Sequence, residues 1–426
     1  MGTWQATKAS VPIVAKVALS ILVYCLAVAL VPIVNKEIFS GDTSGQPKFP
    51  YPCATAFLQL GSVALVLSSL NVLGHFVRCG GSNTEASWLF GPHFLYKLRH
   101  VAPVGILFGL KYGITNWGLQ LMPTDKHLLL QSTDMIWTVA AARVLNKERL
   151  GLLEYLSALL STIGSLMIGW HTGQTLNSPA LPLLVNCLTP LVLALCIATL
   201  RAGAKELFDP ANILQGSVTP TEFTAIKLIL SACVALLLSL LLENGQLYML
   251  PSLKRSVRPA WWVAVGDYPE GSVPVFFLGG IVGVLVFQVN LTWLSALTSA
   301  TAVGIVGGLK VVPQWLLNAA FHLRVDLSPL NVAGATLVLS GSLLYAMAIS
   351  LTCGLALSRR GFEWIPRTSE KSFSEAQEPC LARTRIDGKE RPLPTCTSKL
   401  PVLTVGSVID TLLVMPRAGP APAPPL

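Results

Sequence analysis

Charged side chains are scarce in this chain of 426 residues. Asp, Glu, Lys and Arg together make up 12% of it, while hydrophobic residues make up 52%. An ordinary soluble domain carries about 25% charged residues, so this composition excludes a soluble protein with a conventionally hydrated surface. The charged residues gather in short clusters, and the runs between them are apolar. A helix of about 20 apolar residues crosses a bilayer. The sequence therefore predicts an all-α integral membrane protein.

Several chemical signatures are also missing. The nine cysteines include no CxxC pair, which argues against a disulfide framework or a metal site. We find no Gly-rich phosphate loop, HExxH, GxSxG or paired catalytic carboxylates, so the sequence predicts neither an enzyme nor a bound cofactor. The net charge is +9, but the basic residues lie at the ends of apolar runs. This is typical of membrane boundaries, and no nucleic-acid partner is predicted.

The apolar runs predict about ten transmembrane helices, at 11–34, 52–77, 101–122, 124–145, 150–170, 181–203, 222–246, 273–296, 299–321 and 328–354. Almost no loop separates the third range from the fourth, or the eighth from the ninth. These tight hairpins occupy matching places in two sets of five helices. We therefore expect a 5+5 inverted repeat, with repeat one at about 11–170 and repeat two at about 181–354.

The carboxyl-terminal region differs in composition from the rest. Residues 1–354 form the predicted transporter domain, whereas residues 355–426 are charged and rich in Ser, Thr and Pro. Such a segment cannot bury enough apolar surface to fold, so we expect a disordered tail. Lys and Arg are more numerous in the short loops on the side that holds both termini. This bias predicts that both termini, and hence the tail, are cytosolic.

Three ionisable residues lie near the centres of predicted helices: Lys111, Asp134 and Lys310. Such residues are costly in a bilayer and usually face a cavity or a partner. We expect Lys111 and Asp134 to form a charge pair across the tight hairpin, with a proton-coupling role for Asp134 as an alternative. Lys310 has no acidic residue in its own helix or the preceding one, and is expected to be an unpaired cation for an anionic ligand. The competing interpretation is a structural pair between Lys310 and Asp134.

Polar residues accompany these charges in the same helices. His127, Gln131, Asp134 and Thr138 form a stripe at i, i+4, i+7 and i+11. Interhelical hydrogen bonds are the alternative explanation for such residues. Glycines at four-residue spacing, such as Gly304 and Gly308, predict close helix packing. Residues predicted to hydrogen-bond a substrate are Gln131, Ser132, Thr133, Tyr112, Thr115, Asn116, Gln288 and Asn290.

Several short motifs resemble those of a known transporter group. They are Asn35-Lys36, followed by Phe49-Pro50-Tyr51-Pro52 and Gln59; GITNWGL at 113–119; and LTSATAVGIVGGLK at 297–310. Over residues 10–354 the chain resembles the triose-phosphate and nucleotide-sugar transporters of the drug/metabolite transporter superfamily, which are solute carrier family 35-like. The resemblance implies a 5+5 inverted repeat and exchange transport. It also implies a central site in which Lys310 matches a lysine that holds phosphate or nucleotide, and Lys36 joins the predicted substrate-binding residues.

The chain departs from this group at two cationic positions. Gln131 stands where the plastid triose-phosphate translocators have a lysine, and Val311 replaces the arginine that follows their second lysine. Paired cationic contacts are what grip a small phosphate dianion. The loss of two of three cations therefore argues against a triose-phosphate substrate.

Together these observations predict a membrane antiporter for a nucleotide sugar or a related anionic, phosphorylated metabolite. We expect it in the Golgi or endoplasmic reticulum membrane, and a homodimer is compatible with the sequence. Two alternatives keep the fold. One is a non-transporting scaffold or regulator that acts through the tail. The other is a carrier of cationic drug-like or peptide substrates, which requires Asp134 to be free and Lys111 to point away from the cavity.

Overall fold

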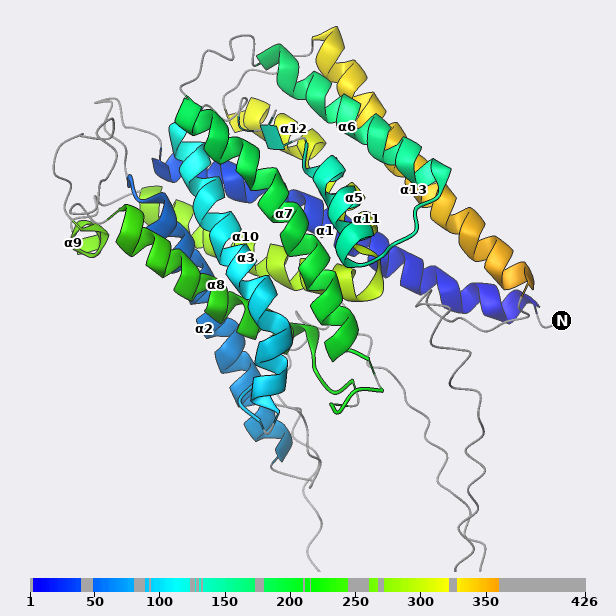
Figure 1. Cartoon of the computed structure of the whole chain (residues 1–426), viewed down its shortest axis with the longest axis horizontal. Coiled ribbons are helices and arrows are strands. Elements are labelled where there is room, and N and C mark those ends of the chain that lie inside the picture. The colour runs from blue at the N-terminus through cyan, green and yellow to red at the C-terminus, as the bar shows by residue number, and fades with distance from the viewer. Residues whose placement is uncertain are drawn as a thin grey trace, which may run out of the picture. The chain divides into compact units, whose positions relative to one another are not determined.

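The computed structural model describes residues 3–39, 49–79, 89–91, 93–122, 127, 130–131, 133–172, 180–209, 211–214, 216–243, 260–266, 272–321 and 328–359. The described helices are α1 (Thr3–Phe39), α2 (Pro52–Cys79), α3 (Phe94–Leu121), α5 (Asp134–Leu145), α6 (Leu152–Thr172), α7 (Ala180–Leu207), α8 (Pro220–Leu242), α9 (Trp261–Gly266), α10 (Ser272–Leu297), α11 (Ala300–Leu309), α12 (Val311–Phe321) and α13 (Pro329–Arg359). The described residues form no strand, so the all-α prediction is confirmed (Figure 1).

All ten predicted ranges contain helix, but within the described residues six helical segments are both long and apolar enough to cross a membrane. These segments are Leu19–Phe39, Pro52–Phe76, Ala180–Leu207, Pro220–Leu242, Pro274–Ala296 and Pro329–Ala348. The short helix α9 lies outside the predicted ranges. By compactness the chain divides into Met1–Ala348 and Ile349–Leu426. Of the second unit only the end of α13 is described, so most of the predicted tail, residues 360–426, lies outside the described residues.

The range 299–321 was expected to be one helix, and this expectation is wrong. Two helices, α11 and α12, meet at Lys310. The cause is Pro313, which has no N–H and so cannot donate the helical hydrogen bond to the carbonyl of Leu309. The turn at Lys310 is tighter than an α-helix, because the Lys310 N–H donates to the Gly307 carbonyl, three residues earlier, at 3.3 Å. The ordinary helical spacing resumes after it, since the Gln314 N–H donates to the Lys310 carbonyl, four residues earlier, at 3.0 Å. A polar interruption therefore lies in the middle of an apolar segment.

The range 124–145 is also interrupted. Its second half is the regular helix α5, which begins at Asp134, and Thr133 immediately before it lies in a turn. The Thr133 hydroxyl donates to the Leu130 carbonyl at 2.9 Å. Because α5 packs against α11, the two interruptions lie close to one another.

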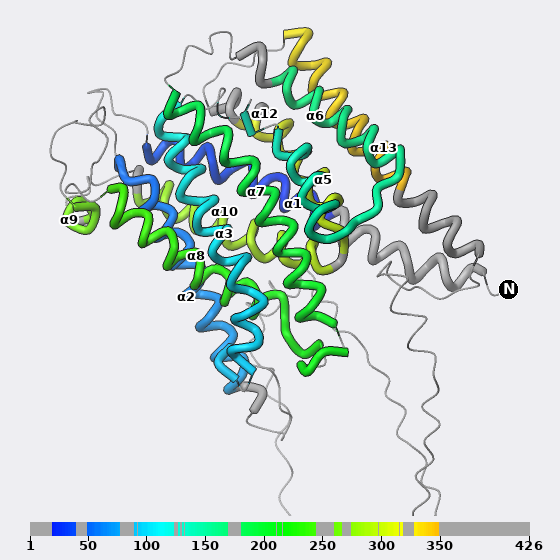
Figure 2. The backbone as a smooth tube through the Cα atoms, in the orientation of Figure 1, coloured from blue at the N-terminus to red at the C-terminus, as the bar shows by residue number. Residues whose placement is uncertain are grey.

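Several helix contacts of the Met1–Ala348 unit come in matched sets. Helix α1 packs on α10, and α3 packs on α7; α3 packs on α8, and α10 packs on α2; α5 packs on α7, and α12 packs on α1. In the two predicted sets of five helices, α1 corresponds to α7, α2 to α8, α3 to α10, and α5 to α11 with α12. When each helix is replaced by its counterpart, the first contact of each set becomes the second. Two further contacts, α2 with α8 and α5 with α11, are converted into themselves. Figure 2 traces how α3 runs alongside α7 and alongside α8.

Glycines allow several of these contacts to be close, as their spacing predicted. A Cβ atom added at Gly109 of α3 would lie 2.5 Å from the Ser231 carbonyl oxygen of α8. A Cβ atom at Gly304 of α11 would lie 2.6 Å from the Thr138 Cγ2 atom of α5. These distances leave no room for a side chain. Helix α5 therefore packs closely against α11, and α3 packs closely against α8.

Two carboxylates, the half-buried Glu148 and the buried Glu243, join the two halves of the chain. The Glu148 carboxylate, just after α5, accepts hydrogen bonds from the backbone N–H of Ala300 at 2.9 Å and of Thr301 at 3.2 Å. It therefore caps the start of α11. The Glu243 carboxylate, just after α8, accepts from the backbone N–H of Cys53 at 2.5 Å and of Ala54 at 2.9 Å, at the start of α2. A carboxylate at a helix amino terminus satisfies free N–H groups and the helix dipole together.

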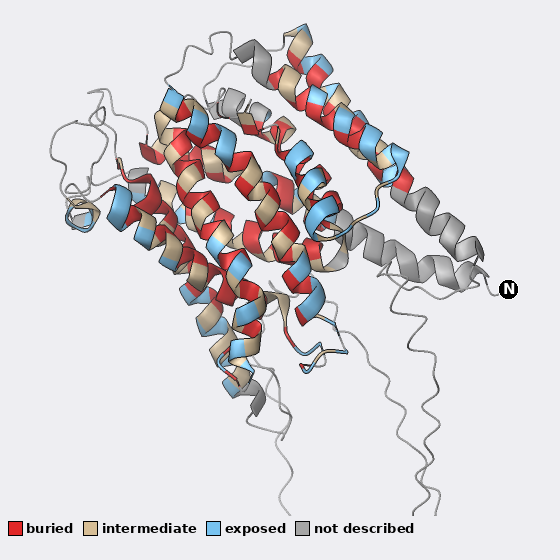
Figure 3. Ribbon diagram, viewed as in Figure 1, coloured by how far each residue is buried: buried red, intermediate tan, exposed pale blue. Residues whose placement is uncertain are grey.

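Large apolar side chains cover much of the outer surface of this unit. Leu152 of α6 is 84% exposed and Leu65 of α2 is 69% exposed, and many similar residues follow on other helices. Figure 3 shows exposed positions alternating with buried ones along the same helices. A soluble monomer rarely exposes so much apolar surface. In a bilayer the same surface faces lipid, which agrees with a multi-pass membrane protein.

Candidate functional site

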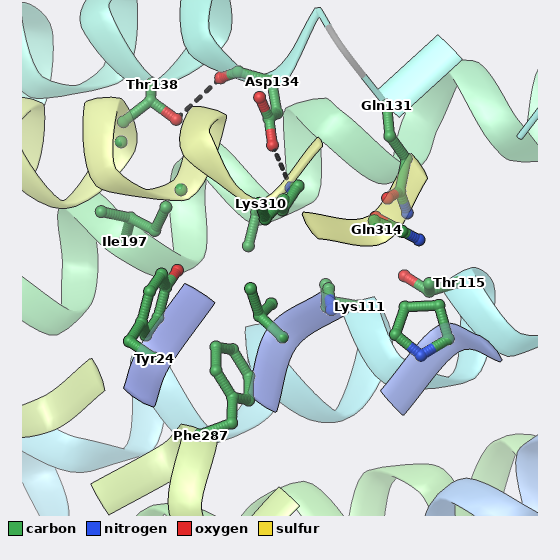
Figure 4. A pocket seen from close by; sticks show the side chains of 15 residues that line it. Tyr24, Lys111, Thr115, Gln131, Asp134, Thr138, Ile197, Phe287, Lys310 and Gln314 are labelled. Carbon is green, nitrogen blue, oxygen red and sulfur yellow. Dashed lines mark hydrogen bonds and ion pairs between the residues drawn. The ribbon is translucent and has the colours of Figure 1, made fainter. Parts of the chain in front are cut away.

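A small cavity lies where the break between α11 and α12 faces α1, α3, α5, α7 and α10. Its volume is about 40 Å³, which is room for a few water molecules. Figure 4 shows its two kinds of wall. The apolar wall includes Tyr24, Val28, Leu193, Ile197 and Phe287, and the polar wall includes Lys111, Thr115, Gln131, Asp134, Lys310 and Gln314.

An ion pair forms one part of the polar wall. The Lys310 ammonium, at the break between α11 and α12, donates to the Asp134 carboxylate at the start of α5 (Figure 4). The two side chains are 7% and 8% exposed. Two expectations are therefore wrong: Lys310 is not an unpaired cation, and Asp134 pairs with Lys310 instead of Lys111. The alternative pairing, Lys310 with Asp134, is the one observed.

The physical reason for this pairing is the packing of α5. Gly304 of α11 faces Thr138 of α5, and Gly308 lies beside Met135. This close contact brings Asp134 and the Lys310 turn to the same level. Helix α3, which carries Lys111, packs instead mainly on α7 and α8. Lys111 and Asp134 are therefore close in sequence, but they do not form an ion pair in the structure.

Lys111 is the other cation of the cavity. It is 9% exposed, and its ammonium lies 4.5 Å from the centre of the Tyr112 ring. Within the described part of the chain it has no hydrogen bond and no acidic partner. The cavity thus contains one neutralised lysine, Lys310, and one lysine, Lys111, whose ammonium lies against an aromatic face and has no hydrogen bond to the described residues.

Uncharged polar groups beside Lys111 also lack partners among the described residues. They are the Thr115 hydroxyl and both polar atoms of the Gln314 side chain, which are buried. Gln131 is 7% exposed and likewise has no side-chain partner in the described ranges. Buried polar atoms are normally hydrogen-bonded. Several unpartnered ones around a single cavity indicate a place where a polar ligand or water can bind.

Gln314 was not predicted as a site residue, although the sequence contained a signal for it. It follows Lys310 by four residues, a spacing that puts two side chains on one face of a helix. Tyr24 and Phe287 of the apolar wall were also missed, because aromatic residues in apolar helices give no distinctive pattern. Of the predicted substrate-binding residues, the cavity contains Gln131, Thr115 and Lys310.

Other predicted substrate-binding residues hydrogen-bond to neighbouring helices instead. The Gln288 amide donates to the Tyr112 hydroxyl at 2.8 Å, which joins α10 to α3. The Asn290 side-chain oxygen, Oδ1, accepts from the Ser20 hydroxyl at 2.7 Å, which joins α10 to α1. These are interhelical bonds, the alternative explanation that the sequence left open. Contact of these residues with a substrate stays a prediction.

The remaining predicted residues are Lys36 of α1 and Asn116 of α3, which bond near the carboxyl-terminal end of α3, and two residues that directly precede α5. The Lys36 ammonium donates to the carbonyls of Leu119 at 2.8 Å and Met122 at 3.2 Å. The Asn116 side chain accepts from the Asn35 amide at 3.0 Å. Neither Lys36 nor Asn116 lines the cavity. Thr133 bonds within its own turn, and Ser132 lies outside the described residues.

A further buried lysine, Lys227 of α8, lies outside the cavity. It is 0% exposed. Its ammonium is 3.0 Å from the Thr292 hydroxyl and 4.8 Å from the centre of the Phe108 ring, and no acidic partner is described. The sequence analysis missed it because it lies near the end of a predicted helix. Lys97 of α3 and Glu222 of α8 form a separate buried pair.

The long apolar helices and their exposed apolar surface define a multi-pass membrane protein. No protein-family model matches the chain. Solute carrier family 35 member E4 of Rattus norvegicus is 26% identical over 348 residues, which cover 80% of this chain and 84% of that protein. The resemblance to solute carrier family 35, expected from the motifs, is thus confirmed. A solved crystal structure that shares 14% sequence identity has a similar fold, with a TM-score of 0.50, and covers 78% of this chain and 97% of its own.

Proposed function

We propose that this chain is a membrane transporter that exchanges a nucleotide sugar or a related anionic, phosphorylated metabolite by alternating access. The observation that carries the proposal is the buried cavity with unpartnered polar groups at the interruption of α11 and α12. The similarity to a solute carrier supports it. So does the composition of the cavity, in which two lysines face one acid.

The interrupted helices favour a transport site over a structural defect. Irregular backbone at membrane depth is tolerated where it lines a cavity, and transporters bind substrates at such discontinuous helices. Here the turn before Asp134 occurs in the predicted fourth helix, and the turn at Lys310 occurs in the predicted ninth. These helices are counterparts in the proposed 5+5 inverted repeat.

The matched helix contacts support that inverted repeat. A chain of two unrelated halves has no reason to repeat its contacts under exchange of the halves. In the proposed repeat the two halves surround one axis, and rocking of one half against the other alternates access to the cavity. The small volume of the cavity fits this mechanism, because a nucleotide enters only when the halves have moved apart.

The carboxylate caps fit the same movement. Glu148 and Glu243 each bind the start of a helix from the other half of the chain. In the proposed ten-helix topology, with cytosolic termini, the Glu148 contact lies on the cytosolic face and the Glu243 contact on the luminal face. One of the two contacts has to break when the corresponding face opens. The organelle we propose, Golgi or endoplasmic reticulum, rests on the resemblance alone.

The charge arrangement argues against a carrier of cations. That alternative requires Asp134 to be free and Lys111 to point away from the cavity. Instead, Asp134 is paired with Lys310, and Lys111 lines the cavity. The scaffold alternative depends on the tail, residues 360–426, which lie outside the described residues.

Exchange in proteoliposomes tests the proposal. Vesicles preloaded with a nucleotide sugar, a nucleoside monophosphate or a sugar phosphate are supplied with the same radiolabelled compounds outside. We expect uptake that depends on the internal compound and survives removal of residues 360–426. Thr115→Val, which removes an unpartnered cavity hydroxyl, should lower uptake about tenfold.

Ser161→Ala is the matched control for this variant. Its hydroxyl is also buried and unpartnered, but lies outside the cavity, so uptake should persist. Absence of exchange for every compound, in protein that remains folded, would contradict the proposed transport. Loss of uptake on removal of the tail would favour the scaffold.

A further inference from the structure

The lysine that resemblance marks for anion binding, Lys310, is already neutralised. Its ammonium contacts the Asp134 carboxylate, and both side chains are almost fully buried. An anionic ligand at Lys310 has to compete with a carboxylate that the chain holds in place through the glycine contacts of α5 and α11. Displacing Asp134 would leave a buried negative charge beside the ligand's own, which is strongly unfavourable.

Lys111 has no such competitor. It lines the same cavity, and the described residues offer its ammonium no acid and no hydrogen-bond acceptor. The face of the Tyr112 ring, 4.5 Å away, stabilises a cation less well than a hydrogen-bonded anion does. An ammonium kept in such a place gains most from a ligand that carries a negative charge.

The groups around Lys111 complete an oxyanion site. Gln314, which is fully buried, has an amide N–H₂ without a partner, and Thr115 has a hydroxyl without a partner. Figure 4 shows Thr115, Gln131 and Gln314 on the same side of the cavity as Lys111. An oxyanion presents several acceptor oxygens to donors of this kind. With Lys310 neutralised by Asp134, the cavity retains one unbalanced positive charge.

We propose that Lys111, framed by Gln314 and Thr115, is the residue that binds the anionic group of the transported solute, whereas Lys310 serves as the counter-ion of Asp134. The group bound is an oxyanion with one negative charge, such as a phosphodiester or a carboxylate, and not a terminal phosphate dianion. This inference rests on the transport function proposed above and names the cation that function uses.

The test measures binding and stability of purified full-length protein in detergent. The probes are a nucleoside diphosphate sugar, in which each phosphoryl group carries one negative charge, and a nucleoside monophosphate, whose terminal phosphate is a dianion. We expect the nucleotide sugar to bind the wild type more tightly at pH 7.5. Lys111→Met should weaken its binding about tenfold or more, without lowering the melting temperature, because no partner is left unpaired. Lys111→Arg should restore part of the affinity.

Lys227→Met is the matched control. It also removes a buried lysine without an acidic partner, but at a place outside the cavity, so affinity should be unchanged. If the nucleotide sugar binds the wild type and Lys111→Met equally well, the inference about Lys111 is wrong and the proposed transport stands. Tighter binding of the monophosphate would overturn the assignment of a singly charged group. If neither probe binds the wild type, the proposed substrate class fails and this inference fails with it.

Discussion

The ion pair between Lys310 and Asp134 makes a quantitative prediction about stability. The perturbation is a double-mutant cycle of Lys310→Met, Asp134→Asn and the two combined. Because both side chains are less than a tenth exposed, each single substitution leaves a buried charge without its partner. Such a loss costs about 3–5 kcal/mol. Replacing both partners removes the uncompensated charge, so the double variant should lie within about 1–2 kcal/mol of the wild type.

The two single substitutions should not be equivalent. Lys310→Met leaves the Asp134 carboxylate in a cavity that still contains Lys111, so its cost should lie near the lower end of that range. Asp134→Asn leaves two lysines facing one cavity, and their repulsion adds to the cost. We therefore expect Asp134→Asn to be the more destabilising. This asymmetry follows from the presence of Lys111 and would be absent if Lys111 pointed away.

Unfolding in detergent, followed by tryptophan fluorescence against temperature and against added sodium dodecyl sulfate, measures all four proteins. The chain has ten tryptophans, which provide ample signal. The refuting result is additivity: if the double variant loses the sum of the two single losses, the residues are not partners. A larger loss for Lys310→Met than for Asp134→Asn would refute the placement of Lys111.

Three further predictions concern packing, caps and topology. Gly164→Ala should destabilise the protein by about 1–3 kcal/mol, because the added Cβ would lie 2.5 Å from the Gly334 carbonyl oxygen. Gly74→Ala is the control and should leave stability unchanged, because nothing lies within 4 Å of its added Cβ. Equal melting temperatures of the two variants would show that the close contact at Gly164 is absent. Glu148→Gln and Glu243→Gln should each lower the free energy of unfolding by about 1–2 kcal/mol. The change in melting temperature measures this loss, and an unchanged melting temperature would show that the cap contributes nothing to stability. Epitope tags at both termini should be stained in cells permeabilised only at the plasma membrane; one hidden tag would contradict either the cytosolic orientation or the number of spans.

The positions of the helices could be predicted from sequence because the bilayer imposes them. A run of about 20 apolar residues has few alternatives to a spanning helix, and α2, α7 and α10 begin within a few residues of the predicted starts. The break at Lys310 was not predicted, although Pro313, three residues later, explains it. The apolar run 299–321 was interpreted as one helix, and the effect of a proline inside it was not considered.

The partners of polar residues could not be read from the sequence. The sequence places two lysines, Lys111 and Lys310, at a membrane depth similar to that of Asp134. The close glycine contact between α5 and α11 brings Asp134 to Lys310. Gln288 and Asn290 have the residue types expected of a binding site, yet they bond across to Tyr112 and Ser20. A periodic pattern reveals which face of a helix is polar. Whether that face meets another helix or a cavity depends on packing.

The division of the segment 299–321 at Lys310 has a consequence for biogenesis. Helix α11 has ten residues and α12 has eleven, so each is only about 15 Å long, half the thickness of the hydrocarbon core. A nascent segment with a lysine at its centre inserts poorly by itself. The carboxylate that neutralises this lysine belongs to α5, which is synthesised more than a hundred residues earlier. Stable insertion of the later segment therefore depends on an earlier helix already standing in the membrane, and a cell that makes Asp134→Asn should lose protein to quality control during synthesis.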